Sequence, residues 1–332
     1  MIAVVDGHND ALLRAWRSGG SLRERSGEGD LDLPRMREGG IAAAFFAIFV
    51  PATDEEPADP RRDLVPTDGG YEVPQEGPLP FERAVRVADE LAAIAERDLR
   101  LVRSADELLA GDAILHLEGA EPIAPDLSNL EAWYERGLRS LGIVWSRPNA
   151  FGHGVQFRYP GTPDTGPGLT VAGRRLVAAC NELGVMVDLA HLNGPGFREV
   201  AELSHAPLVS THTAAHALCP IPRNLTDAQL DAIRDSGGLV GIVFDTVMTR
   251  ADGELVLDTP LSVIAAHIEY VAERIGVEHV ALGSDFDGCF PPAALDDASK
   301  MQALLDELAW SEDDLRALAH RNWLRVLRET WR

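Results

Sequence analysis

Short, continuous apolar runs recur along the chain, and most are bounded by Gly, Pro or Asp. Several are rich in Val and Ile, which favour strands, and an unbroken run predicts a strand buried on both faces of a parallel sheet. The runs are Ile2–Val5, Ile41–Val50, Ala113–Leu117, Leu138–Trp145, Val185–Leu189, Leu208–Ser210, Leu239–Phe244 and Val280–Leu282.

The segments between these runs carry apolar residues at helical spacing. The clearest are Phe81–Arg97, Thr170–Leu183, Thr226–Asp235, Leu261–Ile275 and Glu312–Trp331. Strands that alternate with helices in this way predict one α/β domain over residues 1–332, a closed (β/α)8 barrel of the TIM type. A doubly wound open sheet is the structural alternative.

Two stretches interrupt the alternation, Pro51–Pro80 after the second run and Ser146–Gly168 after the fourth. Both are rich in Gly and Pro, so we expect long loops. Long loops in a compact domain are often functional, and loops that follow barrel strands lie on the catalytic face. They are therefore candidate walls of a substrate pocket, although simple surface excursions are the alternative.

The charge of the chain limits the classes of binding partner. The chain has 53 acidic and 30 basic residues and a formal net charge of −23. This speaks against nucleic acid and anionic membrane partners. The first ten residues lack the basic start and apolar middle of a signal peptide, and no apolar run reaches the length of a membrane span, so we expect a cytoplasmic protein. The three cysteines, Cys180, Cys219 and Cys289, are expected to be free thiols.

Candidate chemistry begins directly after the first apolar run, in Asp6-Gly7-His8-Asn9-Asp10. In an extended backbone His8 and Asp10 point to the same side, so one imidazole and one carboxylate are presented together. Nitrogen and oxygen ligands suit a borderline metal such as zinc.

The third run ends in His116-Leu117-Glu118-Gly119-Ala120-Glu121. A carboxylate at the end of a buried strand is costly to desolvate unless it is paired or binds a metal. Glu118 is therefore a candidate ligand, and its two oxygens could bridge two cations. We expect His116 to lie beside a ligand or in the core, and Glu121 to belong to a loop or a helix start.

Two more histidines, His191 and His212, also lie where a predicted strand meets its loop. A lone histidine is more often structural, but histidines and acids at four strand ends favour a shared metal site. The remaining histidines that lack this placement are treated as ordinary: His205, His216, His267, His279 and His320.

The last run leads into Gly283-Ser284-Asp285-Phe286-Asp287-Gly288. Asp285 would enter the same barrel mouth, where it could accept a proton from water or hold a substrate ammonium group. Asp287 is expected to stabilise the turn with Gly288. Arg223 offers a fork that matches a carboxylate, but loop arginines are usually solvated, so its position alone does not mark a site.

Together these segments resemble the membrane (renal) dipeptidase family, peptidase family M19, of the amidohydrolase superfamily. The resemblance runs from Asp6-Gly7-His8-Asn9-Asp10 to the Asp285 segment, and it includes Gly168-Leu169-Thr170 and Pro222-Arg223-Asn224-Leu225-Thr226-Asp227. It implies a (β/α)8 barrel with two divalent metal ions, for which we expect zinc, and it is compatible with a homodimer.

By position, the resemblance implies that His8 and Asp10 bind one metal, that Glu118 bridges both, and that His191 and His212 bind the second. It also implies that Arg223 holds the terminal carboxylate of a substrate. Asp285 would meet the substrate amino group and move the proton.

The sequence departs from the family at one position. Many members carry a histidine after strand four that contacts the scissile carbonyl, and Trp145 stands there in this chain. An indole donates one hydrogen bond but cannot become a cation. His153 and Arg147 lie nearby and are candidate substitutes, which makes Trp145 and His153 candidate substrate-binding residues.

The expected function is that of a metallo-dipeptidase, a hydrolase whose candidate substrates include dipeptides with a D-residue at the C-terminus. The alternatives are hydrolysis of another small amide, an N-acyl amino acid or a lactone, which Trp145 favours, and a non-catalytic metal-binding relic. The metal ligands and Asp285 speak against the relic.

Overall fold

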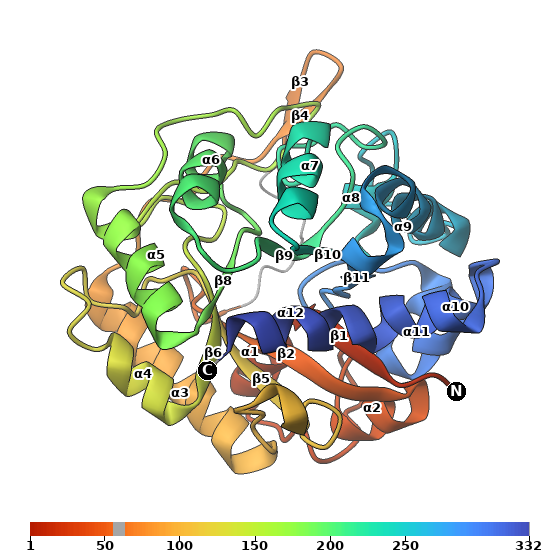
Figure 1. Ribbon diagram of the computed structural model, residues 1–332, viewed down its shortest axis with the longest axis horizontal. Coiled ribbons are helices and arrows are strands. Elements are labelled where there is room, and N and C mark those ends of the chain that lie inside the picture. The colour runs from red at the N-terminus through yellow and green to blue at the C-terminus, as the bar shows by residue number, and fades with distance from the viewer. Residues whose placement is uncertain (56–63, 332) are drawn as a thin grey trace.

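The computed structural model describes residues 1–55 and 64–331, and eight parallel strands in it form one sheet in the order β1-β2-β5-β6-β8-β9-β10-β11 (Figure 1). The strands are β1 (Val4–Asn9), β2 (Ile41–Phe49), β5 (Ala113–Glu118), β6 (Leu138–Gly142), β8 (Met186–Asp188), β9 (Val209–Thr213), β10 (Leu239–Ile242) and β11 (Val280–Leu282). Each of the eight predicted apolar runs contains or overlaps one of them.

Backbone hydrogen bonds join the first strand to the segment that follows the last one. The Asp285 N–H donates to the His8 carbonyl at 3.0 Å, and the Asp10 N–H donates to the Phe286 carbonyl at 2.8 Å. The eight strands also lie side by side in the order in which they occur along the chain, whereas the strand order of a doubly wound sheet reverses at a switch point. The (β/α)8 prediction is confirmed, and the open-sheet alternative is wrong.

Helices surround the strands (Figure 1). They are α1 (Ala11–Ser18), α2 (Leu33–Gly39), α3 (Phe81–Asp98), α4 (Leu130–Arg136), α5 (Val171–Leu183), α6 (Gly194–Leu203), α7 (Asp227–Asp235), α8 (Thr246–Thr249), α9 (Leu261–Ile275), α10 (Met301–Glu307), α11 (Glu312–Arg316) and α12 (Asn322–Thr330). Hydroxyl groups start two of the predicted helices, because Thr170 accepts from the Gly173 N–H and Thr226 accepts from the Gln229 N–H.

The C-terminal helix α12 crosses the barrel and contributes to an apolar cluster inside it (Figure 1). Trp323 is fully buried and packs against Phe45 of β2 with ring centroids 4.7 Å apart. A Cβ on Gly7 would come within 2.6 Å of both the Trp323 ring and the Thr211 carbonyl oxygen. The absence of a side chain at Gly7 therefore allows β1 to pack closely against both Trp323 of α12 and the backbone of β9.

The two long loops pair with each other. A small antiparallel sheet joins β3 (Val65–Thr67) and β4 (Gly70–Glu72) from the first loop to β7 (Arg158–Tyr159) from the second. These segments are thus partly ordered as strands; the stretch 56–63 of the first loop lies outside the described residues. No helix in the described part of the chain combines the length and apolar character that crossing a bilayer needs. The three cysteines are free thiols, as expected.

Candidate metal centre and active site

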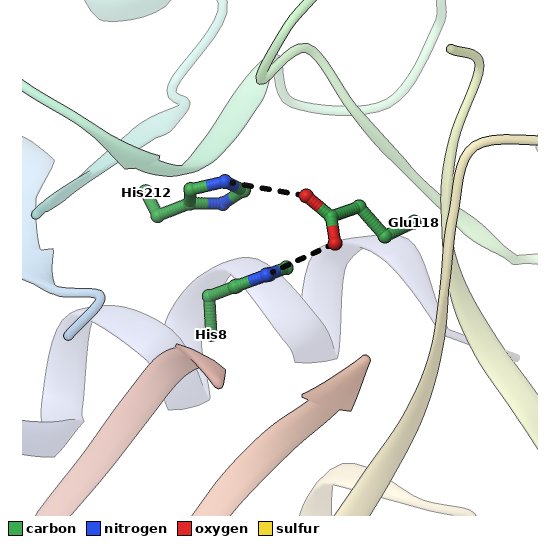
Figure 2. Close-up of side chains that lie close together, drawn as sticks. All are labelled: His8, Glu118 and His212. Carbon is green, nitrogen blue, oxygen red and sulfur yellow. Dashed lines mark ion pairs between the residues drawn. The ribbon is translucent and has the colours of Figure 1, made fainter. Parts of the chain in front are cut away.

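The five predicted ligands meet at the carboxyl ends of the strands. His8 lies in β1, Glu118 ends β5 and His212 lies in β9 (Figure 2). The other two lie just beyond strands, Asp10 after β1 and His191 three residues after β8. All five are buried. Parallel strands of a barrel carry their carboxyl ends to one face, and this brings together residues that are up to 204 positions apart.

The two carboxylate oxygens of Glu118 contact different histidines. Its Oε2 is 3.5 Å from His8 Nε2, and its Oε1 is 2.9 Å from His191 Nε2 and 3.7 Å from His212 Nε2. Figure 2 shows the carboxylate directed between the rings of His8 and His212. Asp10 lies on the His8 side, with Oδ2 3.7 Å from His8 Nε2. One carboxylate with an oxygen toward each group is the arrangement of a bridging ligand.

Atoms at this site fit a divalent cation. The Nε2 atoms of His191 and His212 lie 3.1 Å apart, and each ring has its Nδ1 against a hydroxyl group. Within the described residues, both ring nitrogens of His8 and Oδ1 of Asp10 are buried without a hydrogen-bond partner. Buried polar atoms are almost always satisfied. Imidazole and carboxylate donors are those that zinc prefers.

The pKa values of neighbouring buried groups at this site are shifted in opposite directions. Burial disfavours a charged His8, but the carboxylates of Glu118 and Asp10 outweigh it and raise the pKa of His8 well above its usual value. Burial lowers the pKa of His191 and His212 well below the usual value and raises that of Glu118. Burial therefore keeps His191 and His212 neutral, and the neutral imidazole is the form that binds a metal ion.

Asp285 joins the same cluster. Its Oδ1 lies 3.8 Å from His8 Nε2, and burial raises the pKa of its carboxyl group well above the usual value. Asp285 and His191 both adopt a left-handed backbone, with φ of 64° and 65°. This conformation is uncommon for residues other than glycine and often occurs at functional sites. A carboxyl group with a raised pKa beside metal ligands suits proton transfer.

Arg223 is buried rather than solvated, with 4% of its surface exposed. Its Nη2 donates to the His212 carbonyl at 3.1 Å, and its Nε has no partner. Among the described residues no carboxylate lies within 4.0 Å of the guanidinium. Burial also lowers the pKa of Arg223. The carboxylates of Asp285, Glu118, Asp188 and Asp245 favour its charge from a distance, but none forms a direct ion pair, so the guanidinium can bind an anionic group from outside.

A cavity of about 590 Å³ opens beside this cluster. Arg223, Trp145 and Asp245 line it, together with Tyr71 and Phe157 from the two long loops. Trp145 also packs on the metal-site histidine His191, with ring centroids 5.7 Å apart. The cavity therefore joins the Arg223 guanidinium to an aromatic wall, and Trp145 is the lining residue that contacts the metal-site histidine.

The two candidate substitutes for the family's histidine do not join this wall. In the described structure His153 is not part of the cavity lining, and its Nδ1 lies 3.3 Å from the Gly168 carbonyl oxygen. Arg147 is fully buried, with Nε 2.9 Å from Glu121 and Nη1 3.0 Å from Glu76. The Arg147 guanidinium thus pairs with acids from two other loops, and this pairing does not support Arg147 as the substitute for the family's histidine.

Several polar residues that contact the ligands were not predicted from the sequence. Ser146 and Thr211 contact the Nδ1 atoms of His191 and His212, and Asp188 accepts from Thr211. Each lies within a few residues of a predicted site residue, which is the only signal the sequence carried. The Asp287 carboxylate accepts from Arg14 Nε and from the backbone N–H groups of Asp30 and Leu31, and its role in its own turn stays a prediction.

His116 lies beneath the cluster, with Nδ1 2.8 Å from the Ser140 hydroxyl and Nε2 3.6 Å from Asp188. Among the described residues, potential ligand atoms converge in two sets, His8 with Glu118 and His212 and His8 with Asp10 and Asp285, and His116 belongs to neither. Glu121 lies in the turn after β5, as expected, and pairs with Arg147.

Known proteins resemble the chain throughout. A family profile described as membrane dipeptidase (peptidase family M19) matches residues 1–331. Dipeptidase aclJ of Aspergillus oryzae is 30% identical, with 98% of this chain and 78% of that protein covered.

Two solved structures are closer still, and each comparison covers 99% of both chains. A dipeptidase AC described as an M19 metallopeptidase has a TM-score of 0.93 and 44% identity. A metallopeptidase from Rhodobacter sphaeroides, liganded with a phosphinate mimic of the dipeptide L-Ala-D-Ala, has a TM-score of 0.92 and 43% identity. The resemblance seen in the motifs is confirmed, and the chain belongs to the membrane dipeptidase family, the metallopeptidases of family M19.

Proposed function

We propose that this protein hydrolyses the peptide bond of dipeptides at a centre that holds two zinc ions. The observation that carries the proposal is the position of Glu118, which directs one oxygen toward His8 and the other toward His191 and His212. His8 and Asp10 would hold one ion, His191 and His212 the other, and Glu118 both. Two ions so held would supply an acidified water and a Lewis acid for the scissile carbonyl.

Asp285 and Arg223 select the substrate by its charged ends. The unpaired guanidinium of Arg223 binds the C-terminal carboxylate, and Asp285 accepts the amino group. Asp285 also takes the proton from the attacking water and returns it to the leaving nitrogen, acting first as a general base and then as a general acid. A site that requires both charged termini of the substrate excludes longer peptides.

Trp145 forms the apolar side of the site. Its ring packs against Phe49 and Phe157 with centroids 5.1 and 5.5 Å away. In this place the family's histidine is replaced by a neutral, bulky group, so contacts near the reacting carbonyl are apolar apart from one N–H. The ligand-bound relative from Rhodobacter sphaeroides supports substrates with a D-residue at the C-terminus.

A second candidate function follows from the same tryptophan. An N-acyl amino acid offers a carboxylate to Arg223 but no ammonium group to Asp285, and its acyl chain would suit an apolar wall. Dipeptides remain favoured because Asp285 lies within 3.8 Å of His8 at the same centre.

The test is a hydrolysis screen with protein whose metal content has been measured. L-Xaa-L-Xaa and L-Xaa-D-Xaa dipeptides are compared with the matching N-acetyl amino acids. Release of amino acids from dipeptides alone supports the proposal. Hydrolysis of the N-acyl compounds alone would replace it with the second candidate, and protein that binds no metal would contradict both.

A further inference from the structure

A chain of hydrogen bonds leads from the barrel interior to His212. Asp188 ends β8, and Thr211 and His212 are neighbours in β9. The Thr211 hydroxyl lies 2.7 Å from Asp188 Oδ2 and 2.9 Å from His212 Nδ1. All three residues are at most 1% exposed, so bulk water does not compete for these contacts.

The direction of each bond follows from counting protons. A hydroxyl group has one proton, and a carboxylate oxygen only accepts. The short contact with Asp188 therefore uses the Thr211 proton, and Thr211 Oγ1 is left as the acceptor for His212. The proton in that bond must come from Nδ1 of His212. Its Nε2 then carries the free lone pair, which faces Glu118 and His191.

Two backbone groups hold Asp188 in place. Its Oδ1 accepts from the N–H groups of Ala190 at 3.1 Å and Thr211 at 2.8 Å. The carboxylate is thus fixed with Oδ1 toward the backbone and Oδ2 toward the hydroxyl. His191 has no such constraint, since Ser146 Oγ lies 2.8 Å from its Nδ1, and among the described residues no carboxylate accepts the Ser146 hydroxyl proton.

We propose that Asp188 and Thr211 are positioning residues that keep His212 protonated at Nδ1 and so present Nε2 to the metal. The inference rests on the proposed metal centre for its purpose. Its structural basis, the tautomer of one ring, can be measured without metal or substrate. Outer partners of metal-binding histidines commonly fix the tautomer in this way.

The decisive variant is Asp188→Asn, which keeps the shape and reverses the hydrogen bonds. The two backbone N–H groups require the amide oxygen at the Oδ1 position, so the NH2 group faces Thr211. The hydroxyl then accepts from the amide and donates to His212 Nδ1. This forces the ring proton onto Nε2, the atom needed for the metal.

The tautomer is read by NMR of 15N-histidine-labelled, metal-free protein, because protonated and unprotonated ring nitrogens have well separated shifts. The His212 signals are assigned by their loss in His212→Gln. We expect Nδ1–H in the wild type and Nε2–H in Asp188→Asn, with zinc affinity lowered by about 10- to 100-fold, the range for outer partners of metal ligands.

Thr211→Val tests the relay without touching Asp188, and Thr211→Ser restores the hydroxyl. We expect a mixture of tautomers and weaker zinc binding in Thr211→Val, with both recovered in Thr211→Ser. Ser210→Ala is the matched control, because Ser210 is a buried neighbour on β9 whose hydroxyl has no partner among the described residues.

The outcomes separate the inference from the proposed function. An unchanged tautomer in Asp188→Asn or in Thr211→Val overturns the inference, as does equal loss of zinc binding in Thr211→Ser and Thr211→Val. If Asp188→Asn does not fold, the threonine pair decides. A wild type with the expected tautomer that fails to bind zinc contradicts the metal centre instead.

Discussion

Replacing Arg223 with methionine should separate substrate binding from stability. The guanidinium is buried, has no carboxylate within 4.0 Å among the described residues, and donates to the His212 carbonyl. Loss of that hydrogen bond costs about 1 kcal/mol. Removing a buried charge that lacks a partner recovers several kcal/mol of desolvation. We therefore expect metal-free Arg223→Met to unfold at a temperature equal to or above that of the wild type.

Catalysis should change in the opposite direction. Truncating one partner of a buried charge pair costs 2–5 kcal/mol, and a middle value of about 4 kcal/mol corresponds to about 10³-fold in kcat/KM. The assay compares a dipeptide with its C-terminal amide, which lacks the carboxylate. Wild type should lose about as much on the amide as Arg223→Met loses on the dipeptide, and the variant should barely distinguish the two substrates.

Arg139 supplies the matched control for this prediction. It is also buried, but its guanidinium donates to the carbonyl oxygens of Arg103, Tyr134 and Leu138. Arg139→Met leaves those oxygens unsatisfied, so it should lower the unfolding temperature and leave dipeptide kinetics unchanged. The reasoning is refuted if Arg223→Met hydrolyses dipeptides as well as the wild type does, or if it destabilises the protein as much as Arg139→Met.

Three further predictions concern the reacting centre. Asp285→Asn should lower kcat by about 10²- to 10⁴-fold, the usual contribution of a general acid–base group, while the metal content measured by mass spectrometry stays unchanged; near-full turnover would disprove the proton role. Zinc added to metal-free protein should restore activity in a titration that ends at two ions per chain, and an end point at one ion would contradict the bridging role of Glu118. Trp145→Phe should keep kcat within about tenfold because the contacts with Phe49 and Phe157 are apolar; a loss of about 100-fold would instead show that the indole N–H donates to the reacting carbonyl.

The barrel could be predicted because its information is local. Each buried strand contains or overlaps a mainly apolar run, and the alternation with helices predicts a parallel α/β fold, of which the (β/α)8 barrel was the favoured form. The ends of the runs were less clear. The run Leu138–Trp145 is a strand only to Gly142, and β1 extends to Asn9, because pairing with neighbouring strands sets the ends. The pairing of the two long loops through β4 and β7 depends on contacts between distant segments, which no local pattern reveals.

The candidate site shows the same division. His8, Glu118 and His212 could be identified because each occupies the end of a predicted strand, and the fold alone brings such ends together. The sequence could not predict which arginines form ion pairs. Arg147 and Arg223 were both candidate substrate contacts, yet Glu121 and Glu76 form ion pairs with the first, and no described carboxylate lies within 4.0 Å of the guanidinium of the second. Which cation stays free is decided by side chains from other loops.

The junction between the first and last strands explains why these patterns had to be combined. Asp6 accepts from the backbone N–H and the hydroxyl of Ser284, both at 2.7 Å, across 278 residues of sequence. Two residues after Asp6, the His8 carbonyl accepts from the N–H of Asp285, the residue that follows Ser284. The hydrogen bonds that close the barrel between β1 and the segment after β11 therefore also place Asp285 beside the metal ligands. In the Asp6-Gly7-His8 segment, Asp6 forms a hydrogen bond that closes the barrel, Gly7 leaves room for the Trp323 ring, and His8 is a candidate metal ligand. The same short motif therefore serves both the fold and the proposed chemistry.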